Sequence, residues 1–138
     1  PEFTIPIGKA DVKRKGKDVS LITYSYMVHF ALQAAEKLAQ EGIDVEVIDL
    51  RTIKPMDTET IINSVKKTNR AVCLQETWKT CGVAGEVAAI IADQAFDYLD
   101  APVKRIASPD CPAPFSPDLE TFVLPSVDGI VKAVREIF

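Results

Sequence analysis

The residues best suited to chemistry are three carboxylates and one arginine, each at the end of a short apolar segment or just beyond it. Asp49 and Arg51 lie at the end of one segment, Glu76 follows the next, and Asp110 follows the last. Carboxylates can act as general acids or bases, and an arginine can hold an anionic substrate. Ion pairs of the same kind also fix loops without any catalysis, and we favour that interpretation for Arg51.

Two further features could bind or react. Gly82-Val83-Ala84-Gly85 stands at a predicted helix start, where backbone N–H groups can hold a phosphate. It is not a GxGxxG motif, so we expect its glycines to allow close packing instead, with an anion site as the alternative. His29 is the only histidine, and we expect a structural or surface role for it. With one histidine and no GxSxG motif, no Ser/His/Asp triad can be argued.

The three cysteines do not form a recognisable metal or disulfide pattern. Cys73, Cys81 and Cys111 are widely spaced, no CxxC occurs, and only His29 could join them in a zinc site. We interpret them as reduced thiols of an intracellular protein, with Cys73 in the core.

The periodicity of apolar residues predicts the elements that position these groups. Short apolar runs predict strands at 19–23, 45–50, 71–75 and 103–107, preceded by an extended arm that ends in an edge strand within 5–18. Helical spacing follows each of the first three runs, and two closing helices begin at Ser116-Pro117 and after Ser126. We expect helix caps at Ser25 and Asp57 and helix ends at Gly42 and Asn69. The helix after Gly82 is expected to include Tyr98 on its apolar face.

Strands that alternate with helices define the fold class. We predict an α/β fold, a three-layer α/β/α sandwich with a mostly parallel sheet of about five strands and one antiparallel edge strand. In such sheets ligands bind outside the carboxyl ends of the strands. Asp49, Glu76 and Asp110 should lie there, together with Tyr24, Ser25, Thr77 and Ser108.

Composition excludes several classes of protein. The 138 residues are 47% hydrophobic and 26% charged, which is typical of a globular domain. The net charge of −4 argues against nucleic-acid binding, and no apolar run approaches the roughly 18 residues of a membrane span. The basic segment 13–17 (KRKGK) is interpreted as a solvated turn, with a binding patch as the alternative.

Several longer motifs carry a family resemblance. They are TYSYMV at 23–28, VEVIDLRTIKPMD at 45–57, ETWKTCGV at 76–83, DYLDAPVKR at 97–105, DCPAPF at 110–115 and LPSV at 124–127. In this order they resemble the transketolase C-terminal-like domain of beta subunits of the thiamine-diphosphate-dependent 2-oxo acid dehydrogenases. The pattern is nearest to pyruvate dehydrogenase. Branched-chain 2-oxo acid and acetoin dehydrogenases share much of it and remain alternatives.

The resemblance implies that this chain lacks a complete active site. In the family, a preceding domain of the beta subunit carries the catalytic histidine and binds the aminopyrimidine of thiamine diphosphate. The alpha subunit binds the diphosphate through magnesium. We therefore expect no catalytic, cofactor-binding or metal-binding residue here, and no activity of this chain alone.

What remains for this chain is assembly and docking. The resemblance implies as partners an alpha subunit and a second beta subunit in an α2β2 assembly, and the subunit-binding domain of the acyltransferase core. Phe138 is the residue expected to dock that domain, through its carboxylate if the chain ends there. The implied compartment is a bacterial cytoplasm or a mitochondrial matrix.

Other hypotheses stay open at this point. Residues 1–4 are interpreted as a cloning remnant and residues 5–138 as one domain. A freestanding small α/β enzyme would use Asp49, Glu76 or Asp110, with a closed cavity near Ser25 and Glu76. The equivalent domain of transketolase or deoxyxylulose-phosphate synthase shares the expected fold but not the long motifs.

Overall fold

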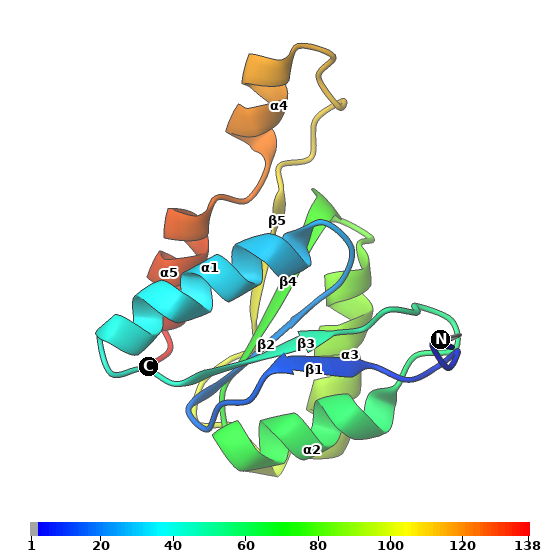
Figure 1. Ribbon diagram of the computed structural model, residues 1–138, viewed down its shortest axis with the longest axis vertical. Helices are drawn as coiled ribbons and strands as arrows, with labels where there is room; N and C mark the ends of the chain where they lie inside the picture. Colours follow the sequence, from blue (N-terminus) through cyan, green and yellow to red (C-terminus); the bar gives the residue numbers. More distant parts are fainter. Residues whose placement is uncertain (1–2) are drawn as a thin grey trace.

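The computed structural model describes residues 3–138, in which five strands form one sheet in the order β1-β3-β2-β4-β5 (Figure 1). The strands are β1 (Asp11–Arg14), β2 (Val19–Thr23), β3 (Val45–Asp49), β4 (Ala71–Trp78) and β5 (Lys104–Ser108). β1 pairs with β3 in antiparallel orientation, and the other three pairs are parallel. The predicted mostly parallel sheet with one antiparallel edge strand is confirmed. β5 lies at the opposite edge, as its polar sequence predicts.

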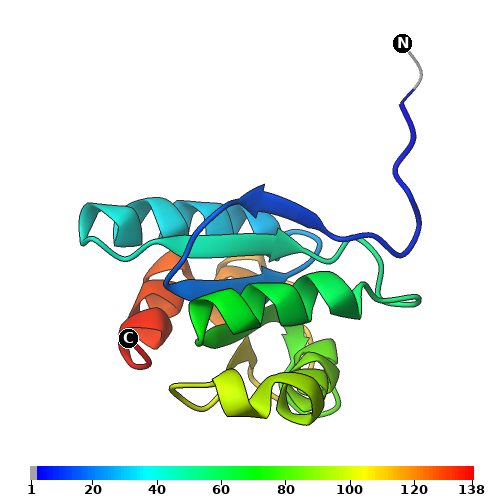
Figure 2. The ribbon, with the colours of Figure 1, turned by 90° about the horizontal axis from the view of Figure 1, so that it is seen from below.

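Helices cover both faces of this sheet (Figure 2). α1 (Met27–Gln40) and α5 (Val127–Arg135) pack on one face, and α2 (Thr58–Thr68) and α3 (Val83–Ala95) pack on the other. Neighbouring strand residues point to opposite faces, so Leu21 joins the core beneath α1 while Ile22 joins the core beneath α2 and α3. Burial on both faces is why these strands read as continuous apolar runs. The three-layer α/β/α prediction is confirmed.

Most of the expected helix ends are present. Asp57 caps α2 by accepting a hydrogen bond from the Thr60 N–H at 3.1 Å, and Asn69 ends α2 in the left-handed conformation. Ser126 caps α5 in the same way as Asp57 caps α2. The expected cap at Ser25 is wrong, because the chain there has a left-handed φ of 57° and α1 begins two residues later. Tyr26 is the N-cap residue, and its side chain makes no cap hydrogen bond.

Two boundaries around α3 also differ from the sequence prediction. α3 ends at Ala95, and the 3-10 helix η1 (Phe96–Tyr98) tightens the chain so that Leu99 can reach the core. Tyr98 is therefore exposed, with the Lys66 ammonium 5.0 Å from its ring centre, and does not belong to the apolar face of α3. β4 continues to Trp78, three residues beyond the predicted strand end.

The basic segment at residues 13–17 packs against β3. Arg14 forms an ion pair with Asp44 at 2.9 Å, which neutralises part of the segment. A Cβ at Gly16 would lie 2.3 Å from the backbone nitrogen of Glu46, so only glycine fits this approach. These contacts support the interpretation as a turn, with no free basic patch required.

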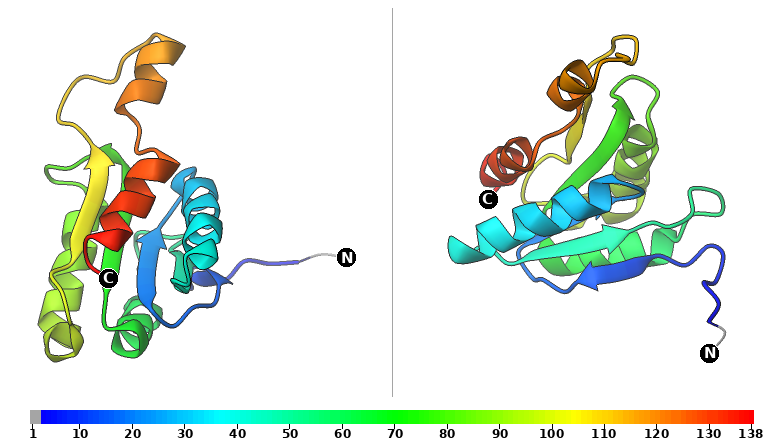
Figure 3. Two further views of the ribbon diagram at one scale, coloured as in Figure 1. Left: turned by 90° about the vertical axis from the view of Figure 1, so that its left-hand side faces the viewer. Right: turned by 45° about the horizontal axis from the view of Figure 1, so that its top comes forward.

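One helix stands apart from the layers. α4 (Pro117–Val123) projects beyond the carboxyl edge of the sheet, as Figures 1 and 3 show, and it buries none of its residues. Pro117 at its first turn agrees with the predicted start. Among residues 3–138, no helix is both long and apolar enough to cross a membrane.

Candidate functional site

The first cavity at the carboxyl edge of the sheet lies between β3, α1 and the N-terminal arm. It has a volume of about 470 Å³, and Ser25, His29, Asp49 and Arg51 are among its lining residues. The Asp49 carboxylate accepts a hydrogen bond from the Arg51 backbone N–H at 3.0 Å. The Arg51 guanidinium forms an ion pair with Asp11 of β1 at 2.7 Å. Arg51 thus ties its loop to the edge strand, which confirms the structural interpretation of this residue.

The basic and acidic side chains in and beside this cavity form ion pairs with one another. Lys13 lies 2.6 Å from Asp11 and 3.8 Å from Asp49. The hydrogen bond from Lys13 is the main cause of the lowered pKa of Asp11; burial opposes the shift, and the charges of Lys13 and Arg51 add to it. Such an arrangement holds β1 against β3 and leaves Arg51 engaged by Asp11.

His29 lies at the rim of this cavity and is exposed. Its ring packs edge-on against Tyr26, with ring centres 6.2 Å apart, which supports the expected structural or surface role. No three histidine, cysteine or acidic side chains within residues 3–138 gather closely enough to hold a metal ion.

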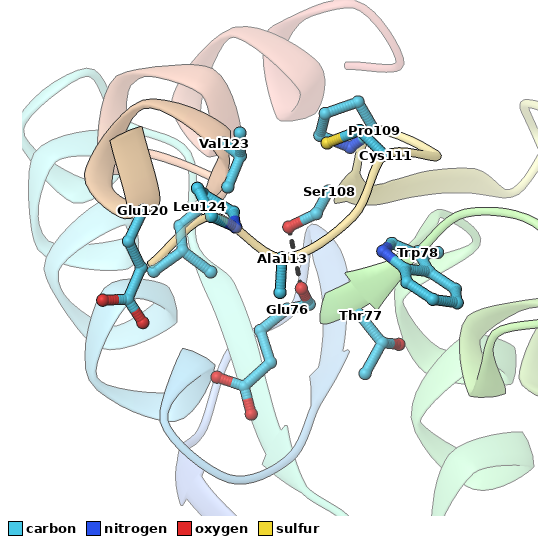
Figure 4. Close-up of a pocket in the computed structure, with 11 residues that line it drawn as sticks. Glu76, Thr77, Trp78, Ser108, Pro109, Cys111, Ala113, Glu120, Val123 and Leu124 are labelled. Atoms are coloured by element: carbon cyan, nitrogen blue, oxygen red, sulfur yellow. Dashed lines mark hydrogen bonds between the residues drawn. The ribbon is translucent and has the colours of Figure 1, made fainter. Parts of the chain in front are cut away.

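A second cavity lies between the ends of β4 and β5, α4, and the proline-rich loop at residues 109–116 (Figure 4). Its volume is about 360 Å³, and its lining is mostly apolar. The lining residues are Glu76, Thr77, Trp78, Ser108, Pro109, Cys111, Ala113, Pro114, Glu120, Val123 and Leu124. The Ser108 hydroxyl donates a 2.7 Å hydrogen bond to the Glu76 backbone carbonyl, which joins the two strand ends.

Two carboxylates face this second cavity, from Glu76 and Glu120. Figure 4 shows that both point away from Trp78, Glu76 from β4 and Glu120 from α4. Within residues 3–138, neither carboxylate belongs to any ion pair. Sequence reasoning identified Glu76 from its place after a strand, but missed Glu120, because only the tertiary structure brings α4 over the strand ends.

Asp110 lines a third cavity, between the proline-rich loop and the loop after β4. Its carboxylate accepts hydrogen bonds from the Thr80 hydroxyl at 2.6 Å and from the Thr80 N–H at 3.1 Å. These two bonds are the main reason for the lowered pKa of Asp110. Asp49, Glu76 and Asp110 thus line three different cavities, and Ser25 lines the first cavity whereas Glu76 lines the second. The structure therefore does not bring together the three carboxylates that a freestanding enzyme was expected to use.

The glycine-rich start of α3 is filled by a side chain of the same protein. The Ala84 N–H donates to the side-chain oxygen of Gln75 at 2.6 Å, and the Gln75 amide nitrogen donates to the Trp78 carbonyl. A Cβ at Gly82 would lie only 1.9 Å from that amide nitrogen. The close-packing interpretation is confirmed, since buried Gln75 takes the place that an anion would need. The sequence feature that could have indicated this packing is a glutamine at the end of a predicted buried strand.

Cys73 behaves as the core residue that its apolar surroundings predict. It is buried in β4, and burial raises the pKa of its thiol to about 12, although the charge of Arg105 acts in the opposite direction. A thiol of this kind is protonated at neutral pH and is a poor nucleophile. Cys73 is therefore a packing residue.

Phe138, the predicted docking residue, is held by a residue that sequence reasoning missed. The Arg70 guanidinium lies 5.4 Å from the centre of the Phe138 ring, and Arg70 Nε donates a 2.9 Å hydrogen bond to the Ile137 carbonyl. The Phe138 side chain is still about half exposed. Arg70 thereby holds Ile137 and Phe138, which follow α5, near the amino end of β4.

Four exposed apolar residues lie on the segments that build the second cavity. The side chains of Trp78, Phe115, Leu119 and Phe122 are 54%, 104%, 56% and 85% exposed. Isolated exposed apolar residues are ordinary, but a group of this size in adjoining segments marks an interaction surface. The sequence places all four in motifs or helices without indicating that the fold leaves them uncovered.

The fold and these features agree with comparisons to known proteins. The model of the family "Transketolase, C-terminal domain" matches residues 8–130. A solved structure titled "Split gene transketolase, inactive beta4 tetramer" aligns with a TM-score of 0.85 and 27% identity, covering 99% of this chain and 43% of that one. This chain belongs to the transketolase C-terminal domain family.

Within that family, its relatives are mainly pyruvate dehydrogenase E1 beta subunits. It is 52% identical over 133 residues to the mitochondrial subunit beta-1 of Arabidopsis thaliana, covering 96% of this chain and 37% of the relative. The beta subunit of Rickettsia conorii is 49% identical, with 96% and 41% covered. The acetoin:2,6-dichlorophenolindophenol oxidoreductase subunit beta of Bacillus subtilis is 47% identical, with 98% and 40% covered. The chain spans about two fifths of the length of these relatives.

Proposed function

We propose that this chain is the C-terminal assembly and partner-docking domain of a pyruvate dehydrogenase E1 beta subunit. That enzyme oxidatively decarboxylates pyruvate and transfers the acetyl group to lipoyl groups. The observation that carries the proposal is the separation of the carboxylates Asp49, Glu76 and Asp110 into different cavities, beside a large exposed apolar surface. Such a molecule is built to contact other chains. We further propose that residues 5–138 form one domain, because a single sheet with helices on both faces runs from residue 11 to residue 135.

The chemistry in this proposal belongs to polypeptide outside this chain. Thiamine diphosphate and magnesium bind between the preceding part of the beta subunit and the alpha subunit. The partners proposed are an alpha subunit and a second beta subunit, in an α2β2 assembly. The transketolase relative is described as a β4 tetramer, which supports assembly through beta-type chains.

Calorimetry and a turnover assay on this chain test whether cofactor binding and catalysis require polypeptide outside it. Titration with thiamine diphosphate and magnesium should give no measurable heat of tight binding, and pyruvate should not be decarboxylated. Micromolar binding of the cofactor, or turnover that disappears in a Glu76→Gln variant, would contradict the proposal and favour a freestanding enzyme.

We propose that Phe138 docks the subunit-binding domain of the acyltransferase core, provided that the polypeptide ends there. Arg70 holds this end against the body of the domain, and the ring remains half exposed. An exposed carboxylate suits a partner that presents arginine or lysine. In the assembled α2β2 enzyme, deletion of Phe138 should weaken binding of the subunit-binding domain while the tetramer stays intact. The deletion moves the terminal carboxylate back by one residue, to Ile137, whereas Phe138→Leu keeps it in place and serves as the control. Equal binding by the deletion variant would exclude this role.

The acetoin-type relative favours one alternative substrate. Its 47% identity over nearly all of this chain is close to that of the pyruvate dehydrogenase subunits. Assays of the assembled enzyme with pyruvate, branched-chain 2-oxo acids and acetoin should show the highest kcat/KM for pyruvate. The names of the relatives include mitochondrial and bacterial proteins, and we propose an intracellular compartment of one of these two kinds.

A further inference from the structure

The cavity between β4, β5 and α4 combines an apolar lining with carboxylates that are unpaired within residues 3–138. The proposed role in assembly does not by itself explain this combination. It is an apolar hollow of about 360 Å³, and two carboxylates, of Glu76 and Glu120, line it without any ion-pair partner in the described part of the chain. An ionised carboxylate beside apolar surface loses part of its hydration when that surface is covered. Any chain that covers this cavity must therefore bring a compensating positive charge.

The surroundings offer no such charge. The segment from residue 108 to residue 125 contains Asp110, Asp118 and Glu120 and neither lysine nor arginine. Arg105, on the neighbouring strand, is directed to the loop after β4, where its guanidinium lies 3.4 Å from the Lys79 carbonyl. The compensating positive charge must therefore come from the partner chain.

The walls of the cavity also limit the shape of that partner. Trp78, Val123 and Leu124 provide an apolar lining, and Leu119 and Phe122 on α4 are exposed beside it. A side chain with an apolar stem and a charged head fits this combination, because it can pack its stem on the lining and extend its head to the carboxylates. The uncovered apolar surface exceeds what a small ion would cover, so the occupant is a polypeptide segment.

We infer that this cavity receives an arginine or lysine side chain, flanked by apolar residues, from another subunit of the assembly. The inference rests on the proposed role in assembly and names the chemistry of one contact. Glu76 and Glu120 are the recognition residues, and Trp78 and the α4 side chains form the apolar wall around the inserted stem.

The single tryptophan of the chain, Trp78, lines the cavity and reports its occupancy. The test follows the indole N–H resonance of Trp78 by NMR while the blocked dipeptide acetyl-leucyl-arginine amide is added. A matched dipeptide with citrulline has nearly the same shape and no charge. The arginine probe should bind roughly tenfold more tightly than the citrulline probe, as expected for a charge-assisted hydrogen bond. The Glu76→Gln/Glu120→Gln double variant should remove that difference.

Glu36→Gln is the matched control, since Glu36 is exposed on α1 and lines none of the three cavities at the carboxyl edge. Equal affinity for both probes, no response of Trp78 up to the solubility limit, or an equal loss in Glu36→Gln would overturn the inference. Dimerisation of the chain alone that the double variant abolishes would agree with the inference and would identify a second copy as the subunit that supplies the side chain. Assembly with an alpha subunit is measured separately by sedimentation. A chain that assembles without preferring the arginine probe disproves only this inference, and a chain that prefers the probe without assembling disproves only the proposed function.

Discussion

At the scale of single residues, Gly82 shows how one missing Cβ allows a helix to start. Gln75 occupies the space beside Gly82 and hydrogen-bonds to the backbone on both sides of it. The glutamine is completely buried, so it cannot swing away into solvent. Because a polar side chain fills the space at the start of α3, residues 82–85 serve close packing.

Gly82→Ala should lower the free energy of unfolding by about 2 kcal/mol, because the new methyl group overlaps Gln75 and lies 2.5 Å from the Trp78 carbonyl oxygen. Urea unfolding followed by circular dichroism measures this change. Gly85→Ala is the matched control: its Cβ would meet only the Arg105 guanidinium, at 3.5 Å. In a helix, that substitution should stabilise by roughly 0.5 kcal/mol. Equal effects of the two substitutions would refute the packing argument.

At the scale of elements, Asp57 connects two segments of the chain, the residue before β1 and the start of α2. Its carboxylate caps α2 through Thr60 and accepts a 3.0 Å hydrogen bond from the Ala10 N–H, which lies just before β1. Burial raises the pKa of Asp57, but the hydrogen bonds from Ala10 and Thr60 outweigh this effect and lower it overall. The edge strand and α2 are thereby fixed to the same side chain.

Asp57→Ala should lower the free energy of unfolding by about 1–2 kcal/mol near neutral pH, as expected for the loss of a helix cap. A carboxyl group with a lowered pKa stabilises the fold above its unfolded pKa, and this contribution disappears as the pH falls through the folded pKa. The difference between wild type and variant should therefore shrink in acid. Asp93→Ala, at an exposed position on α3, is the control. A difference that stays constant down to about pH 2 would contradict this account.

α4 is the element that depends most on a partner. It has seven residues, none of them buried, and a helix this short is not stable by itself in water. In hydrogen exchange followed by mass spectrometry, α4 of this chain should exchange much faster than α5, whose Ile130 and Val134 are fully buried. Protection should rise within the α2β2 assembly. Slow exchange of α4 in the isolated chain would show that it needs no partner.

At the scale of the whole molecule, exposed ion pairs join elements that are distant in sequence. Glu41 and Arg135 connect the ends of α1 and α5, Lys37 and Asp128 connect the same two helices, and Lys104 connects β5 to Glu136. Hydrogen bonds from the basic partners are the main cause of the lowered pKa values of Glu41, Asp128 and Glu136. The layers are thus linked across their surfaces as well as through the core.

These lowered pKa values predict the response of the molecule to acid. Each such carboxylate stabilises the fold above the ordinary carboxyl pKa of about 4, and the stabilisation is lost as the pH falls through the lower folded value. The urea midpoint should be constant above about pH 5 and should fall below about pH 4. High salt should reduce this fall, because it screens exposed pairs. A midpoint that rises in acid would show that the carboxylates do not support the fold.

The sequence by itself determined the elements, their order and the class of fold. Apolar periodicity and helix caps depend on neighbouring residues, so strands 19–23 and 45–50 and the caps at Asp57 and Ser126 could be read from local patterns. Ser25 was misread because its left-handed backbone is set by the turn into α1, and Tyr98 because Leu99 is drawn into the core.

Only the tertiary structure decided which side chains meet. Asp49, Glu76 and Asp110 lie at or after the ends of their strands, yet they line different cavities. β2 lies between β3 and β4, and Asp110 lies in the loop after β5, where it hydrogen-bonds to Thr80. Glu120 joins Glu76 only because α4 folds back over the ends of β4 and β5. Contacts of this kind link residues about forty positions apart, and local sequence patterns do not encode the path of the chain between them.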